Sequence, residues 1–141
     1  MRFERRLYAS KTPEETLRLI ADFRNLKAWD DSVQSVVARG DSFGQGSEYD
    51  VRVLFSGNPI DMVYTVTVYE PGVCAVLTGV APKATAIDRV KVAPIKQGTQ
   101  VDYVAEIRLA FPYNLLDPLL AIGFKKTVDH AVAGLRRFLS A

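Results

Sequence analysis

The sequence predicts an α+β protein in which a seven-stranded antiparallel sheet curves around one long C-terminal helix. Three observations carry this prediction. Residues 117–139 place apolar side chains on one face of a helix of about six turns. Most of residues 33–110 alternate between apolar and polar side chains, which is typical of strands. The connections between these strands are short, which favours antiparallel neighbours. Because an amphipathic helix needs a cover, we expect the sheet to supply it and to leave a pocket between the two.

The first strand is expected at residues 2–9, where polarity alternates. Thr12 suits the N-cap of the helix that follows, Pro13 suits its first position, and Glu15 completes a capping box. Asn25 is expected to cap a second short helical turn. Because these two short helices connect the first and second strands, we expect them to close one end of the sheet.

From residue 33 onward, apolar residues recur at every second position. The remaining strands are expected at residues 33–38, 49–55, 60–69, 73–80, 84–93 and 99–110, with turns at Ser56-Gly57-Asn58, Pro71-Gly72, Pro82-Lys83 and 94–98. In the last hairpin, a register with Val92 opposite Thr99 would place Asp88 opposite Tyr103. The same register sets Arg89 against Asp102, an opposite-charge pair that favours it.

The long helix is predicted to bury a single stripe. That stripe consists of Leu120, Phe124, Val128, Ala131, Leu135, Phe138 and Leu139. Gly123 and Gly134 interrupt this helix, and each costs about 1 kcal/mol relative to alanine. We expect them to allow either a close approach of the sheet or a bend that widens the mouth of the pocket.

Composition limits the function classes. The 141 residues fit one domain, residues 1–141, with 48% hydrophobic and 24% charged residues. The net charge of +2 is small and scattered, which argues against nucleic-acid binding. The sequence contains no apolar run of about 18 residues, so we expect no stable membrane insertion. Cys74 and His130 are the single cysteine and histidine, so we expect no metal site and no cofactor. The lone cysteine and the charged first residues favour a cytoplasmic protein, and a homodimer remains open.

Four segments resemble a known superfamily. Residues 19–30 (LIADFRNLKAWD) are similar to the "adf.n...W.." segment of the START-like (SRPBCC) proteins, which include the polyketide cyclase/dehydrase-like proteins and the Bet v 1 allergens. Residues 46–49, 69–71 and 98–103 resemble that superfamily's glycine before its third strand, its "yep" turn and its "GT.v.y" strand, in the expected order. The resemblance implies a helix-grip fold, a bent sheet wrapped around a C-terminal helix, with a cavity that binds an apolar or aromatic small molecule.

The concave face of the sheet and the helix stripe are expected to line this cavity. The predicted ligand-binding residues are Trp29, Tyr49, Val51, Val53, Met62, Tyr64, Val66, Leu77, Asp88, Val90, Val101, Tyr103, Leu120, Phe124 and Val128. A mostly apolar wall with a few polar groups is the usual profile of a small-molecule site. Trp29 either packs over the open end of the cavity or gates it.

Asp88 is the candidate acid or base, because its neighbours on the same face of the strand are apolar. Tyr64 and Tyr103 are the candidates for orienting a substrate or stabilising an enolate. The alternative is a structural role for Asp88, with Arg5 either as its ionic partner or directed outward. His130 falls on the polar side of the helix, and nothing beside Cys74 activates that thiol.

Three functions follow from these residues and the resemblance. The first is the binding of a hydrophobic or aromatic molecule that is lipid-, quinone- or polyketide-like. The second is a cyclase/dehydratase-like enzyme that uses Asp88. The third is a chaperone-like subunit that passes a lipid or quinone to a partner, for which a convex patch around Val76, Ile87 and Val104 is the candidate surface.

Overall fold

A computed structural model describes residues 1–55 and 57–141. Ser56, which belongs to one predicted turn, lies outside the described residues. The elements follow in the order β1 (Arg2–Ala9), α1 (Pro13–Ala21), η1 (Phe23–Asn25), α2 (Leu26–Trp29), β2 (Val33–Ala38), β3 (Glu48–Phe55), β4 (Asn58–Glu70), β5 (Cys74–Ala81), β6 (Ala84–Ile95), β7 (Gly98–Leu109), η2 (Tyr113–Leu116) and α3 (Asp117–Ser140).

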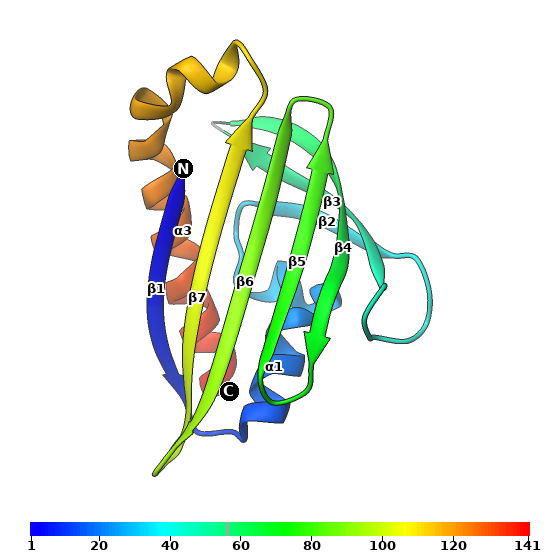
Figure 1. Ribbon diagram of the computed structural model, residues 1–141, viewed down its shortest axis with the longest axis vertical. Helices are drawn as coiled ribbons and strands as arrows, with labels where there is room; N and C mark the ends of the chain where they lie inside the picture. The colour runs from blue at the N-terminus through cyan, green and yellow to red at the C-terminus, as the bar shows by residue number, and fades with distance from the viewer. Residues whose placement is uncertain (56) are drawn as a thin grey trace.

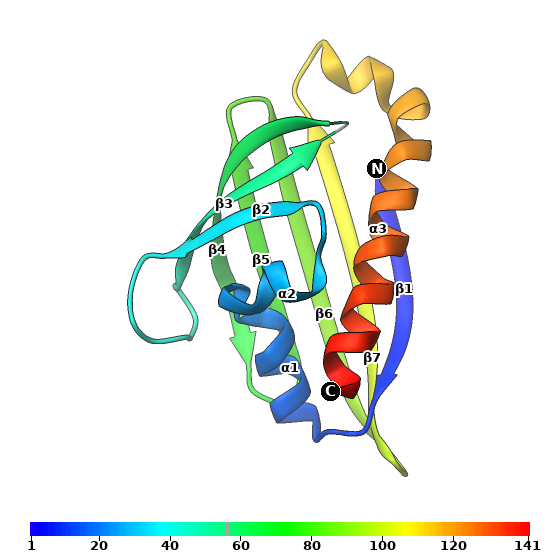
Figure 2. The same ribbon diagram turned by 180° about the vertical axis from the view of Figure 1, so that it is seen from behind.

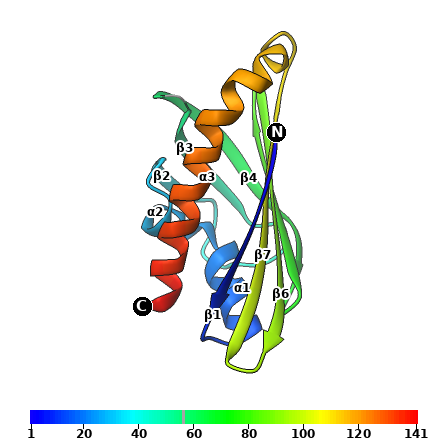
Figure 3. The ribbon, with the colours of Figure 1, turned by 90° about the vertical axis from the view of Figure 1, so that its left-hand side faces the viewer.

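The strands form one antiparallel sheet in the order β1-β7-β6-β5-β4-β3-β2. The sheet is strongly curved, and α3 lies along its concave side with α1 and α2 (Figures 1 and 2). Seen from the side, β1, β6 and β7 form one layer and α3 forms the other (Figure 3). The predicted α+β fold, with seven strands, a long C-terminal helix and short helices between the first two strands, is confirmed.

The start of α1 matches the sequence. The Thr12 side chain accepts a hydrogen bond from the Glu15 amide at 3.2 Å, and Pro13 opens the helix. The predicted cap of the next turn is wrong. Asn25 makes no capping bond, and the Asp22 carboxylate accepts from the Arg24 amide at 3.1 Å instead. Asp22 has the extended backbone of a cap, whereas Asn25 is already in a helical conformation.

The predicted register of the last hairpin is wrong by two residues. Val92 pairs with Val101, and Asp88 pairs with Ala105. The reason is the turn. Ile95 pairs directly with Gly98, so only two residues connect the strands, and both strands run further than the sequence indicated. A shift of two residues keeps every side chain on its own face of the sheet, so Asp88 remains on the concave side.

A β-bulge in β4 interrupts the alternation of this strand. The register between β4 and β5 shifts between Val66 and Val68. Strict alternation would place Val68 on the core side with Val66, but the bulge reverses the parity beyond it. Tyr69 therefore packs against the core, where its ring meets Phe43 edge-on with 4.8 Å between centroids.

The two halves of α3 differ. Its C-terminal half packs firmly, because Val132, Leu135 and Leu139 are buried in the core. Gly134 lies against the backbone carbonyl of Trp29, where a Cβ atom would clash, so this glycine allows a close approach, to α2 rather than to the sheet. Nothing among the described atoms lies within 4 Å of a Cβ placed at Gly123. None of the described helices combines the length and apolar character needed to cross a membrane.

Candidate functional site

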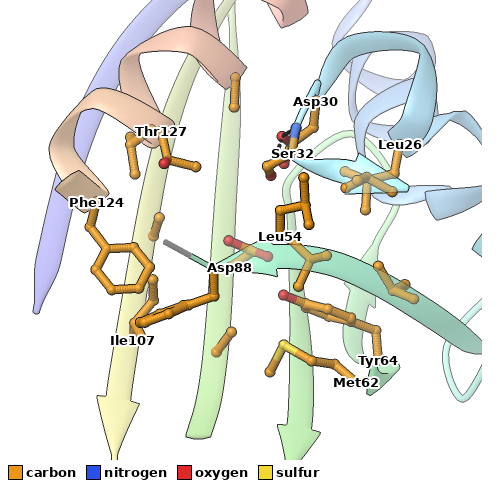
Figure 4. Close-up of a pocket in the computed structure, with 18 of the residues that line it drawn as sticks. Leu26, Asp30, Ser32, Leu54, Met62, Tyr64, Asp88, Ile107, Phe124 and Thr127 are labelled. Atoms are coloured by element: carbon orange, nitrogen blue, oxygen red, sulfur yellow. Dashed lines mark hydrogen bonds between the residues drawn. The ribbon is translucent and has the colours of Figure 1, made fainter. Parts of the chain in front are cut away.

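A cavity of about 130 Å³ lies between α3, the short helices and the middle of the sheet (Figure 4). Its wall is mostly apolar. The lining residues are Phe23, Leu26, Trp29, Asp30, Ser32, Val33, Val51, Val53, Leu54, Phe55, Ile60, Met62, Tyr64, Ala84, Ala86, Asp88, Tyr103, Ala105, Glu106, Ile107, Phe124, Thr127, Val128, Ala131 and Val132. A wall of this kind is typical of small-molecule sites.

Small side chains on two neighbouring strands create this space. Ala84 and Ala86 on β6 and Ala105 on β7 all line the cavity. Ala105 pairs directly with Asp88, and Ala86 pairs with Ile107, so these residues form one contiguous area of the sheet. Alanine leaves room where valine or leucine would fill the concave face, and a void in a close-packed interior is otherwise rare.

The structure places part of the predicted binding set on the cavity wall. These residues are Trp29, Val51, Val53, Met62, Tyr64, Asp88, Tyr103, Phe124 and Val128. The other members lie away from the wall, namely Tyr49, Val66, Leu77, Val90, Val101 and Leu120. Most of these residues do not reach the cavity because α1 packs against β5, β6 and β7 and fills that part of the concave face. The Tyr49 hydroxyl is held by Asp22 at 3.2 Å.

Asp88 enters the cavity from the middle of β6. The pKa of its carboxyl is raised from 3.8 to about 7, mainly because the group is buried and also because the Asp30 carboxylate is near; a hydrogen bond with the Tyr103 hydroxyl opposes this rise in part. With Asp88 paired to Ala105 and Tyr103 paired to Val90, the two side chains are diagonal neighbours on one face. A carboxyl with a pKa near 7 can donate or accept a proton at neutral pH.

The position of Tyr64 depends on a glycine in the next strand. Tyr64 on β4 pairs with Gly79 on β5, and the hydroxyl-bearing end of its ring occupies the space that a side chain at Gly79 would fill. The ring therefore extends across β5, and its hydroxyl lies near Asp88 (Figure 4). Burial and the neighbouring Asp88 raise the pKa of both Tyr64 and Tyr103 well above 10, so both hydroxyls keep their protons.

Asp30 is another acid on the cavity wall, and it is not among the residues predicted from the sequence. It follows α2, and its carboxylate accepts hydrogen bonds from the Ser32 hydroxyl at 2.6 Å and from the Ser32 amide at 3.0 Å. Burial raises the pKa of Asp30, and the bonds from Ser32 lower it in part. A loop residue has no strand parity, so alternation gave no signal for it. The Asp-x-Ser pattern after Trp29 is the signal that could have found it.

Aromatic contacts close two sides of the cavity. The rings of Phe55 on β3 and Phe124 on α3 meet edge-on with 4.2 Å between centroids. The ring of Trp29 packs edge-on against Tyr103 at 6.3 Å. The Trp29 indole N–H is buried and has no hydrogen-bond partner among the described residues. Trp29 thus belongs to the wall of the cavity.

The remaining candidates, Arg5, His130 and Cys74, do not line the cavity. Arg5 donates to the Asp129 carboxylate on α3 at 2.8 Å, so it is not the partner of Asp88. His130 is exposed, and Cys74 is a free, half-buried thiol. The convex residues Val76, Ile87 and Val104 are each partly buried rather than exposed. They therefore do not form the open apolar patch that the sequence indicated.

A curved sheet that grips a C-terminal helix, with an apolar cavity between the two, defines a protein with the helix-grip fold. Over residues 2–139 the sequence matches the family described as polyketide cyclase / dehydrase and lipid transport, and the chain belongs to that family. Comparison with curated protein sequences gives no match.

Solved structures share the fold at low sequence identity. TTHA0849 from Thermus thermophilus superposes with a TM-score of 0.81 at 17% identity, covering 99% of this chain and 97% of that chain. A START superfamily protein from Mycobacterium smegmatis superposes with a TM-score of 0.72 at 15% identity, covering 98% of this chain and 96% of that chain. The Zhui aromatase/cyclase from Streptomyces sp. R1128 superposes with a TM-score of 0.74 at 10% identity, covering 99% of this chain and 90% of that chain. At these identities the likeness concerns the fold.

Proposed function

We propose that the protein binds a neutral hydrophobic or aromatic molecule that carries a carbonyl group, with the carbonyl directed at Asp88. The observation that carries this proposal is a mostly apolar cavity whose wall includes a carboxyl with a pKa of about 7. Ligands of the quinone or polyketide class have the required combination of rings and carbonyl oxygens.

The polar groups of the cavity favour a hydrogen-bond acceptor. Protonated Asp88 and the hydroxyl of Tyr64 are donors, and the unpartnered indole N–H of Trp29 is a third. The lining acids Asp30, Asp88 and Glu106 disfavour a carboxylate ligand, because no lysine or arginine occurs among the described lining residues. A ketone is therefore preferred over a carboxylate of the same size.

The cavity volume limits the part of a ligand that fits. A cavity of about 130 Å³ resembles in size the engineered apolar cavity of about 150 Å³ that holds benzene. One ring fits without rearrangement. A longer molecule would displace the Phe55–Phe124 contact, which is the aromatic closure between the β3–β4 hairpin and α3.

Acetophenone and benzoate provide a matched test of the proposal, since they share size and ring but differ in charge. Trp29 is the single tryptophan of the chain and lines the cavity, so its fluorescence reports occupancy. We expect acetophenone to bind at least about tenfold more tightly than benzoate at pH 6 and to bind more weakly as the pH rises above about 7. Calorimetry provides an independent measure of the same affinities.

A cavity-filling substitution and a control complete this test. Ala105→Leu should abolish binding, because the added side chain occupies the floor of the cavity. Val104→Leu on the same strand points to the convex face and should leave binding unchanged. Equal affinity for benzoate, or full binding by Ala105→Leu, would contradict the proposal.

A second candidate is a cyclase/dehydratase-like enzyme, which the pKa of Asp88 favours. An acid or base with a pKa near 7, beside two protonated tyrosines, can remove a proton next to a carbonyl while a hydroxyl donates to the enolate oxygen. Asp88→Asn separates the two functions. A binding protein keeps its affinity for acetophenone within a few-fold, whereas an enzyme loses turnover and keeps binding.

A further inference from the structure

The exposed apolar residues of this protein are concentrated at one end of the molecule. Phe111, Leu115, Leu119 and Ile122 are 77%, 68%, 73% and 68% exposed. Tyr113 and Leu116, which lie between them in the sequence, are also exposed. We call these six residues the α3 tip. The tip comprises the loop after β7, η2 and the first turns of α3, and it extends to one end of the ribbon (Figures 1 and 3).

The first half of α3 is apolar on two sides. Phe124 and Val128 face the cavity, while Leu119 and Ile122 fall on the opposite side at about 100° per residue. A helix that packs one face on a sheet in water needs only one apolar stripe. The outer stripe is not covered by any described residue, and contiguous exposed apolar surface usually marks an interaction site.

Positive charges border this apolar surface. Lys126 lies one turn after Ile122 on the same stripe, and Lys125 is its neighbour; both are exposed. Lys83, in the β5–β6 turn, is 3.1 Å from the Tyr113 hydroxyl, with its ammonium 5.1 Å from the centre of the ring. Asp117 is the acidic residue within the tip segment. An apolar stripe flanked by lysines complements the interface of an anionic lipid bilayer.

A second copy of the chain fits this surface less well. In a two-fold interface the same patch meets itself, so Lys83, Lys125 and Lys126 of one copy would approach those of the other. Like charges brought together oppose association. A bilayer that contains anionic lipid supplies both the apolar layer and the opposite charge.

We propose that the α3 tip docks on the surface of anionic membranes, and that the bound molecule enters and leaves the cavity there. The proposal of docking depends only on the residues of the α3 tip, whereas the proposal of ligand exchange also rests on the proposed function. The link between them is Phe124, which lies on the opposite side of the same helical turns and closes the cavity against Phe55. Movement of the tip into the membrane interface would therefore shift the turns of α3 that carry Phe124 and loosen the Phe55–Phe124 contact.

Vesicle flotation tests docking directly. The probes are vesicles of phosphatidylcholine alone and vesicles in which one third of the lipid is phosphatidylglycerol. We expect the wild-type protein to bind the anionic vesicles at least about tenfold more tightly than the neutral ones at low salt, and to lose most of this preference at high salt. Equal binding to both vesicles, or binding to neither, would overturn the proposal.

Three double variants identify the surface. Leu119→Gln/Ile122→Gln should lose vesicle binding at least about tenfold, and Lys125→Gln/Lys126→Gln should weaken it by about tenfold. Val37→Gln/Val80→Gln changes two exposed valines outside the tip and should bind as the wild type does. If this control loses binding to the same degree, the tip is not the docking surface. A concentration-dependent dimer that Leu119→Gln/Ile122→Gln dissociates, without vesicle binding, would identify a second copy as the occupant and refute membrane docking.

The acetophenone titration separates docking from ligand binding. Leu119→Gln/Ile122→Gln leaves the cavity-facing side of α3 intact, so it should keep the Trp29 fluorescence response of the wild type, which also verifies that it folds. Vesicle binding by a wild type that fails to bind acetophenone would refute the proposed function and leave docking standing. Acetophenone binding without vesicle binding would refute docking alone.

Discussion

The ring of Tyr64 lies across Gly79 of the neighbouring strand, so that a Cβ atom at Gly79 would come within 2.6 Å of the ring. This contact directs the Tyr64 hydroxyl toward Asp88. Gly79→Ala should force the ring to move and lower the free energy of unfolding by roughly 1–3 kcal/mol, the usual range for overpacking. Urea unfolding measures the loss. In a Tyr64→Leu background the same substitution should cost much less, and an equal cost in both backgrounds would show that the ring is not the cause.

The two glycines of α3 provide a matched pair. Gly134→Ala should destabilise the protein, because the new methyl group meets the Trp29 carbonyl in the contact between α2 and α3. Gly123→Ala meets no described atom and should raise the free energy of unfolding by up to about 1 kcal/mol, the difference in helix propensity. Thermal unfolding of both variants checks the sign. Stabilisation by Gly134→Ala would contradict the close packing of α2 on α3.

Asp88 should make stability depend on pH. Its pKa is about 7 in the folded chain and 3.8 ordinarily, so the folded state holds the proton more tightly than the unfolded state does. The contribution is fully present below pH 4 and is lost as the pH rises toward 7, by at most roughly 4 kcal/mol. Asp88→Asn should therefore unfold at higher denaturant concentration than the wild type at pH 8 and lack this pH dependence. Parallel pH profiles of the two proteins would contradict the burial of Asp88.

The Phe55–Phe124 contact should control the rate at which a ligand leaves. Phe55→Ala opens the aromatic closure, so we expect acetophenone to dissociate several-fold faster, as followed by stopped-flow Trp29 fluorescence. Phe43→Ala is the control, because it removes a similar edge-on pair, with Tyr69 at 4.8 Å, that does not line the cavity. If both variants release the ligand at the wild-type rate, this contact is not the exit.

The fold could be predicted from the sequence, because the patterns that indicate strands and helix ends involve residues close together in the chain. Alternation located the strands, and Thr12 with Pro13 located the start of α1. The register of β6 and β7 was not predictable in the same way, since an opposite-charge pair occurs in both registers. The predicted register sets Arg89 against Asp102, and the observed one sets Lys91 against Asp102. Only the two-residue turn between Ile95 and Gly98 decides between them.

The site was predicted less completely, for two physical reasons. Strand parity identifies a face of the sheet but does not tell which part of that face α1 fills, so Val66, Leu77, Val90 and Val101 were expected on the cavity wall. Asp30 belongs to a loop, and its place in the cavity depends on how α2 packs against α3. Parity did place Asp88 and Tyr64 on the correct side, because neither the register shift nor the bulge reverses their direction.

The alanine floor of the cavity has a consequence for how this scaffold can diversify. Ala84, Ala86 and Ala105 belong to strands whose pairing is made by backbone atoms, so their side chains contribute little to holding the sheet together. Exchanging one of them for serine, valine or leucine would change the shape and polarity of the cavity by one to three heavy atoms, while the backbone pairing of the strands stays as it is. A lineage built on this frame can thus change what it accommodates through single codon changes at these three positions.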